Sequence, residues 1–157
     1  MTIEIPPPGT RGISLRALSM MRAFNGLSVR LYRLTGGRLK GPGGLLLTTV
    51  GARSGRERSA NVAHFPDGDN RFLIVGSFGG AARHPAWFIN LAKNPDQVWA
   101  QLGRDRFKVR PELLEGEERA DAWRRIVAAA PAFAKYEQVT DREIPVVRLT
   151  REPSPDA

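Results

Sequence analysis

The chain has 157 residues, a length that fits one globular domain and leaves little room for a second. It has no cysteine and two histidines, which excludes disulfides, thiolate chemistry and iron–sulfur ligation and leaves too few ligands for a catalytic metal, so we predict no metal site. The formal net charge is +8, and residues 1–40 hold seven basic side chains against one acidic side chain. This asymmetry indicates an anionic partner for that segment: a membrane surface, a nucleic acid or an acidic ligand tail.

The first residues, MTIEIPPPGT, lack the basic start and apolar run of a secretory signal peptide. No apolar stretch approaches the length of about 20 residues that crosses a bilayer. We therefore expect a cytoplasmic protein. We expect three parts in the chain: a basic helical extension over residues 1–40, the main domain over 41–150 and a disordered tail over 151–157.

Residues 13–35 form the first predicted element, an amphipathic helix, because apolar side chains recur there at spacings of three or four with arginines mostly between them. The apolar positions are Leu15, Leu18, Met21, Phe24, Leu27 and Leu31. Gly26 predicts a break in this helix, and Gly36 predicts its end. The apolar face lies in a membrane interface, with the arginines against lipid phosphates, or packs on the domain or on a second subunit.

Six strands and two more helices follow a glycine-rich connector at residues 36–44. We expect the strands at 45–50, 59–65, 71–77, 98–102, 106–114 and 144–149, and the helices at 85–94 and 117–130, the second interrupted by Pro131. The strands pair as antiparallel hairpins rather than through strand–helix–strand crossovers. This order favours a β-barrel or an α+β sheet over a doubly wound fold.

A cationic loop follows the first predicted strand. Arg53, Arg56 and Arg58 lie within six residues and are interleaved with Ser54 and Gly55. Glycine lets a backbone approach an anion, serine adds a hydroxyl donor, and guanidinium groups match phosphate or carboxylate oxygens with paired donors. The loop is either a phosphate cradle or a solvated basic loop.

A second candidate is the segment GSFGGAARHPAWFINL at residues 76–91, where a strand ends in a glycine-rich turn before a helix. The free amides of the turn and of the helix start suit carbonyl or phosphate oxygens, and Trp87 offers a flat wall to an aromatic ring. The alternative is that Trp87 belongs to the core. We expect His84 to be a turn or capping residue rather than a general acid.

Three stretches in unbroken order resemble the deazaflavin-dependent nitroreductase family: LLLTTVGARSGRERSANVAHF, DGDNRFLIVGSFGGAARHPAWFINLAKNPDQV and YEQVTDREIPVVRL. The resemblance covers residues 45–149. It implies a split β-barrel, mainly β or α+β, with flanking helices. It further implies an oxidoreductase that transfers a hydride from reduced coenzyme F420 to an activated acceptor such as a quinone, a nitroaromatic compound or a conjugated enone, with chemistry carried by the cofactor.

The resemblance also implies site residues. The phosphate and oligoglutamate tail of the cofactor is assigned to Arg53, Ser54, Gly55 and Arg58, and its remaining contacts to Ser59, Ala60, Asn61, Val62, Ala63, Ile74, Val75, Gly76, Ser77, Ala86, Trp87, Asn90 and Phe133. Tyr136 is expected in the substrate pocket or as a proton donor.

This chain departs from the family pattern at several positions. Nitroimidazole-reducing members carry tyrosines where it has Ala63, Ala130 and Phe133, which implies a more apolar acceptor pocket. The family often has lysine in place of Phe78, so one cofactor contact is expected to be missing.

The expected partners are the deazaflavin cofactor and a small hydrophobic electron acceptor, with no nucleic acid, because residues 11–40 lack interleaved stacking aromatics. We also expect peripheral contact with the inner face of the plasma membrane through residues 13–35, and a homodimer. Two alternatives stay open: an FMN-dependent split-barrel reductase, and a non-catalytic carrier of the deazaflavin, a tetrapyrrole or a fatty acid.

Overall fold

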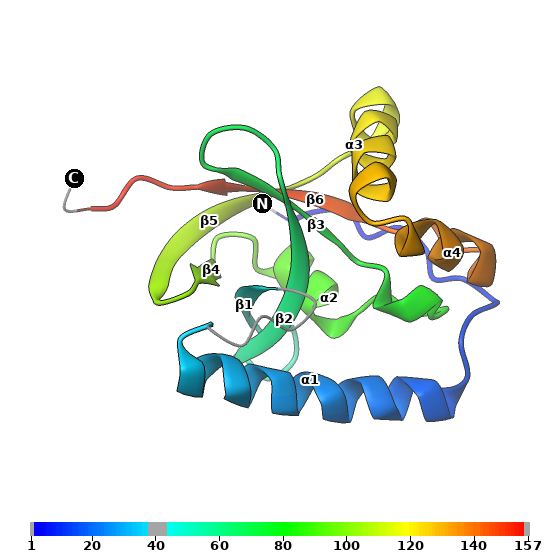
Figure 1. The fold of residues 1–157 in the computed structure, drawn as a ribbon, viewed down its shortest axis with the longest axis horizontal. Coiled ribbons are helices and arrows are strands. Elements are labelled where there is room, and N and C mark those ends of the chain that lie inside the picture. The colour runs from blue at the N-terminus through cyan, green and yellow to red at the C-terminus, as the bar shows by residue number, and fades with distance from the viewer. Residues whose placement is uncertain (1, 38–43, 156–157) are drawn as a thin grey trace.

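The computed structural model describes residues 2–37 and 44–155 and shows a six-stranded antiparallel β-barrel with helices around it (Figure 1). The strands are β1 (Gly44–Val50), β2 (Glu57–Pro66), β3 (Arg71–Val75), β4 (Val98–Leu102), β5 (Asp105–Leu113) and β6 (Val146–Arg151). Their order around the barrel is β1-β2-β3-β6-β5-β4, and β4 closes on β1. The expected strands and hairpins are confirmed, although the closing strand begins two residues later than expected.

The barrel is split along β2. The first half of β2 pairs with β1 from Glu57 to Ala63, whereas β2 and β3 pair only over the three residues from His64 to Pro66. Within the described residues, the second edge of β2 therefore has no strand partner over residues 57–63. An unpaired edge offers backbone donors and acceptors to whatever lies beside it.

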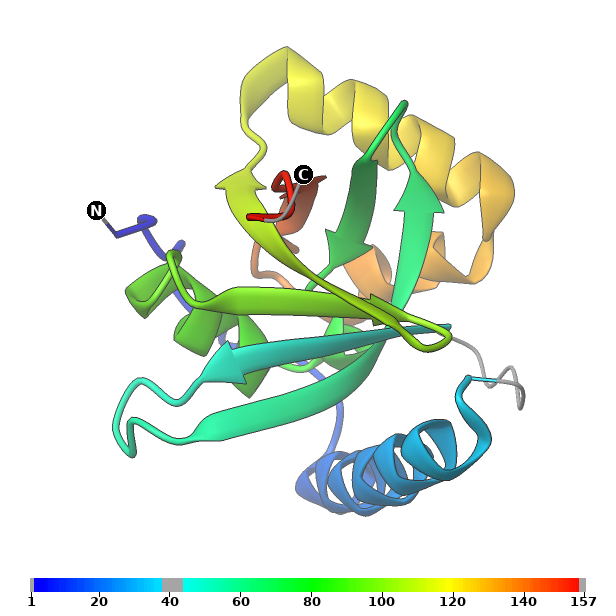
Figure 2. The same ribbon diagram turned by 90° about the vertical axis from the view of Figure 1, so that its left-hand side faces the viewer.

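Four helices and one short turn surround the barrel: α1 (Leu15–Thr35), the 3₁₀ turn η1 (Phe78–Gly80), α2 (Ala86–Lys93), α3 (Gly116–Ala129) and α4 (Ala132–Val139). Figure 2 shows α1 on one side of the barrel and α3 on the opposite side. Helix α4 was not expected, because Pro131 was interpreted only as an interruption. Pro131 precedes the first helical residue of α4. This position suits proline, because the amide hydrogen that proline lacks would have no partner within the helix.

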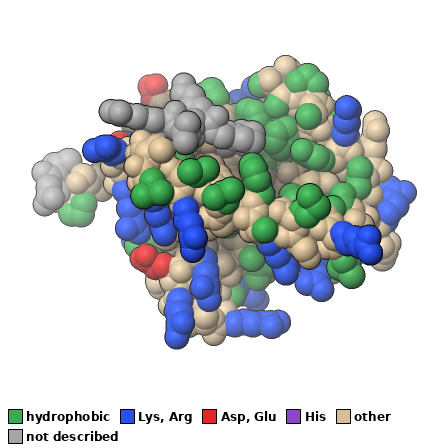
Figure 3. All heavy atoms as spheres, turned by 60° about the horizontal axis from the view of Figure 1, so that its bottom comes forward, with side chains coloured by type: hydrophobic (Ala, Val, Ile, Leu, Met, Phe, Trp, Pro, Cys, Tyr) green, Lys and Arg blue, Asp and Glu red, His purple; other side chains and the backbone are tan. Residues whose placement is uncertain are grey.

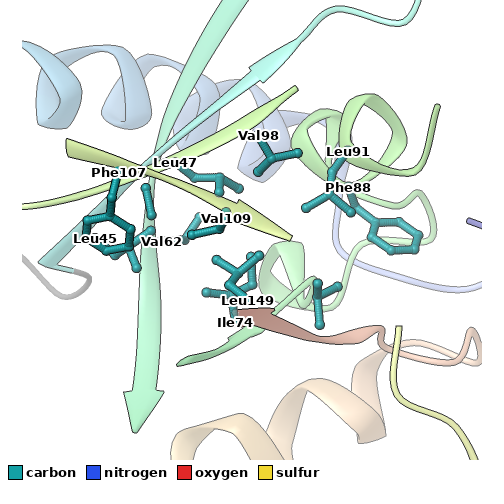
Figure 4. Close-up of a cluster of buried hydrophobic side chains, with 12 residues drawn as sticks. Leu45, Leu47, Val62, Ile74, Phe88, Leu91, Val98, Phe107, Val109 and Leu149 are labelled. Atoms are coloured by element: carbon teal, nitrogen blue, oxygen red, sulfur yellow. The ribbon is translucent and has the colours of Figure 1, made fainter. Parts of the chain in front are cut away.

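The inside of the barrel is filled by one apolar cluster to which β1–β6 and α2 contribute (Figure 4). Its buried members are Leu45, Leu47, Val62, Ile74, Phe88, Leu91, Val98, Ala100, Phe107, Val109, Val147 and Leu149. A second cluster joins the outer face of β3 and β6 to α3 through Leu73, Val146, Trp123 and Ile126. The barrel interior is thus a packed core.

Helix α1 begins after Ser14, whose Oγ accepts the amide of Ala17 at 3.3 Å, and ends before Gly36, which has a φ of 62°. The predicted break at Gly26 is wrong. This residue is exposed, with no atom within 4 Å of a Cβ placed there, so the helix continues past it at the modest cost of a helical glycine.

Helix α1 packs on the barrel through Leu18, Val29 and Tyr32, which are buried. The hydroxyl of Tyr32 accepts the amide of Gly103 at 2.8 Å and lies 2.9 Å from the carbonyl oxygen of Gln101. These contacts determine which face of α1 packs against the barrel. The polar contacts contribute to this orientation as well as the apolar ones.

The expected apolar face of α1 is therefore only partly the packed one. Leu18 is buried and Met21 half-buried, but Leu15, Phe24, Leu27 and Leu31 are exposed. Figure 3 looks at the α1 side and shows hydrophobic side chains exposed there among arginines and lysines. We call the exposed apolar row along this helix the α1 stripe. It consists of Met20, Phe24, Leu27, Leu31 and Leu34.

Residues 3–13 form a strap along the barrel. The amides of Ile3, Gly9 and Ile13 donate to the carbonyl oxygens of residues 92, 82 and 80, at 2.9, 2.8 and 3.3 Å, and Ile3 and Ile5 pack against the barrel core. The first part of the predicted extension is thus attached to the main domain. The predicted boundary at residue 40, most of the connector at 36–44 and the last two tail residues lie outside the described residues.

Candidate cofactor site

The cationic loop joins β1 to β2 at one end of the barrel, the end at which α2 lies (Figure 2). The amide of Gly51 donates to the carbonyl oxygen of Arg56 at 2.8 Å, and the amide of Gly55 donates to that of Gly51 at 2.9 Å. Ser54 Oγ accepts the amide of Arg56 at 3.2 Å, and Gly55 has a φ of 66°. The loop is therefore a tight, internally bonded turn.

The three arginines associated with this loop carry uncompensated charge. Arg53, Arg56 and Arg58 are exposed, and within the described residues none of their side chains forms an ion pair or a hydrogen bond. Some other arginines are neutralised by acids: Arg148 and Arg125 both contact Asp67. Clustered guanidinium groups without counter-charge attract an anion.

Asn90 supports the loop from behind. Its side chain is buried, Oδ1 accepts the amide of Ala52 at 3.0 Å, and Nδ2 lies 3.5 Å from the hydroxyl of Thr49. Asn94 Nδ2 donates to the carbonyl oxygen of Val50 at 3.1 Å. Asn90 was expected among the cofactor contacts, and the structure places it where it supports the cationic loop. Asn94 was expected only as the end of a helix.

The expected contacts on β2 divide between its two faces, because side chains alternate along a strand. Ala60 and Val62 pack in the barrel core. Ser59 faces α1 and accepts a hydrogen bond from Arg33 Nη2 at 2.8 Å. Ala63, the last expected contact on this strand, is half-buried.

Asn61 also faces α1, which covers the unpaired edge of β2 at this point. Its amide donates to Asn25 Oδ1 at 3.2 Å, and its Nδ2 donates to Ser28 Oγ at 2.6 Å. Its Oδ1 is buried with no partner among the described residues. These contacts were not predictable from the apolar periodicity of α1, because Asn25 and Ser28 fall outside it.

Residues 77–81 form a strained turn after β3, which we call the 77–81 turn. Phe78, Gly79 and Gly80 have φ values of 45°, 61° and 81°, and a side chain in this left-handed region is uncommon. The side chains of Ile74 and Val75, also expected at the site, lie in the two apolar clusters, so only their backbone remains for a ligand. Gly76 is buried as well.

The aromatic residues of the prediction lie on two helices. On α2, Ala86 is exposed and Trp87 is half-buried against the barrel core, edge-on to Phe88. On α4, Phe133 and Tyr136 are half-buried with ring centroids 5.4 Å apart in an edge-to-face contact. Helix α4 packs beside the 77–81 turn.

His84 is buried in a hydrogen-bonded position. Its Nε2 lies 2.8 Å from the carbonyl oxygen of Pro6, and its Nδ1 lies 3.3 Å from Arg142 Nη1. Burial, followed by the charge of Arg142, lowers the pKa of His84 against the opposing effect of Pro6. His84 is therefore a neutral structural residue, which agrees with its expected place outside the chemistry.

The structure thus brings the expected residues together in two groups. The cationic loop, Asn90 and α2 lie at one end of β2, while the 77–81 turn follows β3, which pairs with the other end of β2, and α4 packs on that turn. The unpaired edge of β2 runs between the groups. Within residues 2–37 and 44–155, no three His, Cys, Asp or Glu side chains gather as metal ligands, and no helix is long and apolar enough to cross a membrane.

A six-stranded antiparallel barrel split along one strand, with an unneutralised cationic loop at one end of that strand, defines the class of split-barrel flavin- and deazaflavin-type proteins. Solved structures share this fold. HutZ, the heme storage protein from Vibrio cholerae, is 16% identical with a TM-score of 0.53 over 82% of this chain and 90% of its own, a likeness of fold alone.

More similar proteins specify the family. An F420-H2 dependent reductase of known structure is 37% identical, with a TM-score of 0.60 over 67% of this chain and 91% of its own. The F420H(2)-dependent quinone reductase Rv1261c of Mycobacterium tuberculosis is 38% identical over 129 residues, which are 77% of this chain and 85% of the relative. The family model described as F420H(2)-dependent quinone reductase matches residues 20–151. The chain belongs to the F420H(2)-dependent quinone reductase family.

Membership confirms the split barrel, the F420H2-dependent oxidoreductase activity and reduced coenzyme F420 as cofactor. The residues present fit that cofactor. Its polyanionic tail requires cationic groups with free donors, and the three guanidinium groups of the cationic loop are unpaired and exposed. The unsatisfied Oδ1 of Asn61 lies beside the unpaired edge of β2 that follows this loop.

Proposed function

We propose that this chain binds the anionic tail of F420 at the cationic loop and holds the deazaflavin between β2, the 77–81 turn and α2 for hydride transfer to a quinone. The observation that carries this placement is the set of three exposed arginines without counter-charge at the end of an unpaired strand edge. Paired guanidinium donors suit phosphate and carboxylate oxygens.

The bound cofactor supplies the hydride, and the protein supplies binding, orientation and exclusion of water. Arg53, Ser54 and Arg58 hold the tail. Trp87 forms an apolar wall, α4 packs on the 77–81 turn, and the hydroxyl of Tyr136 on α4 serves the acceptor as a proton donor. The acceptor pocket is apolar in character because Phe133 and Phe65 pack edge-to-face beside Tyr136.

Equilibrium titration tests the placement. F420 and, in parallel, FMN are titrated into the wild-type protein and the Arg53→Ala and Arg58→Ala variants. Loss of one charged contact is expected to weaken F420 binding about tenfold in each variant. The control is Arg104→Ala, an exposed arginine in the β4–β5 turn at the opposite end of the barrel. Unchanged affinity in both loop variants, or stronger binding of FMN, would overturn the placement.

A quinone acceptor is tested in the same preparation. Oxidation of bound F420H2 by a menaquinone analogue is followed by the return of deazaflavin absorbance. Tyr136→Phe is expected to lower kcat while leaving the F420 Kd within twofold, because α4 touches the turn through other residues. An unchanged kcat would remove Tyr136 from the proton-transfer role, and an absence of turnover with quinones would favour the carrier alternative.

The α1 stripe supports a further proposal, peripheral contact with an anionic membrane. Phe24, Leu27 and Leu34 are 61%, 56% and 82% exposed, and the helix also exposes Arg16 and Arg30. Exposed apolar side chains beside cations match the interface of an anionic bilayer, where lipid-soluble quinones reside. Cosedimentation with phosphatidylglycerol vesicles is expected and with phosphatidylcholine vesicles is not. Phe24→Ser/Leu27→Ser is expected to abolish it, and equal sedimentation of that variant would contradict the contact.

A homodimer is proposed on the strength of a similar solved structure described as a domain-swapped dimer. That chain is 33% identical, with a TM-score of 0.63 over 79% of this chain and 96% of its own. Light scattering after size exclusion gives the mass in solution. A monomeric mass across the micromolar range would contradict the dimer, and a dimer lost in the Phe24→Ser/Leu27→Ser variant would assign the α1 stripe to a second copy instead of lipid.

A further inference from the structure

Arg142, in the loop between α4 and β6, is 5% exposed and spans the ends of the 77–81 turn. Its Nε donates to the carbonyl oxygen of Ala81 and its Nη2 to that of Ser77, both at 2.7 Å. Its Nη1 lies 3.3 Å from Nδ1 of His84. One planar guanidinium therefore contacts both ends of the turn and the residue that anchors the strap.

No carboxylate neutralises this arginine among the described residues. Asp141 instead accepts hydrogen bonds from Thr10 and from the amide of Arg11, and Glu143 pairs with Arg119 at 3.2 Å. Burial lowers the pKa of Arg142 to about 10, so it stays charged at neutral pH. A buried cation is expensive to desolvate, and here two backbone carbonyl oxygens compensate part of that cost.

The turn held by Arg142 needs support. Phe78 occupies left-handed backbone that a residue with a side chain seldom adopts, and such strain persists only where the surroundings over-determine it. Inside the turn, the amide of Gly80 donates to the carbonyl oxygen of Ser77 and that of Ala81 to Phe78. Arg142 donates a hydrogen bond to a carbonyl oxygen at each end of the turn. The turn is therefore held both by its own backbone hydrogen bonds and by the Arg142 side chain.

The turn is also packed closely against α1 and against α4. A Cβ on Gly79 would lie 3.0 Å from Met21 of α1, and one on Gly80 would lie 3.0 Å from Val139 of α4. Because packing on both sides is this close, a displacement of the turn would move its contacts with α1 and α4 together.

We propose that Arg142 is a positioning residue for the cofactor: it clamps the 77–81 turn, and through the turn fixes the part of the site next to α4. This inference rests on the proposed function. The planar guanidinium of Arg142 is the required feature, because a lysine ammonium presents its donors from one point and does not span two carbonyl oxygens in the same way.

The test compares two buried arginines that lie six residues apart. Arg148 is also largely buried, but it pairs with Asp67 and Glu118 on the α3 side of the barrel. Arg142→Gln, Arg142→Lys and Arg148→Gln are compared with wild type for F420 Kd by fluorescence titration and for Tm. Arg142→Gln is expected to raise Kd about tenfold, the factor for one hydrogen bond that a displaced turn no longer offers the cofactor. The Kd of Arg142→Lys is expected to lie between those of wild type and Arg142→Gln. Arg148→Gln is expected to lower Tm while its Kd stays within twofold of wild type.

Equal Kd changes in Arg142→Gln and Arg148→Gln at matched losses of Tm would reduce Arg142 to a stability residue and overturn the proposal. So would an unchanged Kd in Arg142→Gln. Wild-type F420 binding tests the proposed function by itself, so failure of that function and failure of this inference are distinguishable.

Hydrogen exchange on the wild-type protein keeps the proposal falsifiable if the Arg142 variants do not fold. Saturating F420 is expected to slow exchange of the Gly80 and Ala81 amides at least fivefold relative to the amides at the far end of β5. If F420 binds and these two amides exchange at an unchanged rate, the turn is not part of the site and the positioning role is wrong.

Discussion

Tyr32→Phe tests how α1 is attached to the barrel. Tyr32 is 2% exposed, and its hydroxyl satisfies the amide of Gly103 at 2.8 Å and the carbonyl oxygen of Gln101 at 2.9 Å. The variant leaves both groups without that partner in a site with little access to water. An unsatisfied buried group costs about 1–3 kcal/mol, so we expect a loss of about 2 kcal/mol in the free energy of unfolding. For a chain of this length that lowers Tm by about 4–8 °C.

Urea and thermal unfolding, both followed by circular dichroism, measure the effect. The control is Leu34→Ser on the same helix, where the side chain is 82% exposed and a change within about 0.5 kcal/mol is expected. A Tyr32→Phe variant as stable as Leu34→Ser would refute the attachment through the hydroxyl. It would leave apolar contact by Leu18 and Val29 as the force that holds α1.

Three further predictions concern other parts of the chain. Gly26→Ala is expected to raise the free energy of unfolding by about 0.5–1 kcal/mol, since a Cβ there meets open space; an unchanged urea midpoint would contradict a continuous helix. Burial raises the pKa of Asp67, but hydrogen bonds from Arg148 and Arg125 outweigh this effect, so the net shift of the pKa is downward. The stabilisation by the Asp67 carboxylate is therefore complete above about pH 4 and is lost as the pH falls through the lowered pKa of the folded state. Urea unfolding between pH 2 and 6 is expected to show a wild-type advantage over Asp67→Asn that shrinks in acid; a constant advantage would refute it. Asn90→Ala is expected to weaken binding of F420 but not of a deazaflavin without phosphate and glutamates, because Asn90 supports the cationic loop; equal losses for both ligands would indicate direct contact with the ring.

The fold was predictable because strand periodicity and turn residues are local signals. The six strands and the hairpins followed from the strand patterns and the short connections between them, and the end of α1 followed from Gly36. Helix α4 was missed because Pro131 has two meanings, a break or a start, and nothing nearby in the sequence separates them. The inward face of α1 was missed because polar contacts of Asn25 and Tyr32 with the barrel helped to select it.

The candidate site was predictable where its chemistry lies in adjacent residues. The cationic loop is one short segment, and its unpaired arginines are where the pattern placed them. The supports of the site are long-range: Asn90 lies 38 residues from the loop residue whose amide it binds, and Arg142 lies 65 residues from Ser77. A single sequence holds no local signal for such pairs, since an asparagine on a helix or an arginine in a polar loop has many ordinary uses.

The strap has a consequence for the order in which the parts of this chain fold. The partner of Thr10 is Asp141, 131 residues later in the chain, so docking of the strap closes a very large loop. Closing so large a loop costs conformational entropy that local contacts do not offset, which places strap docking late in folding and strap release early in unfolding. The folding chain therefore passes through a stage in which the barrel has formed while Ile3 and Ile5 have yet to pack against its core.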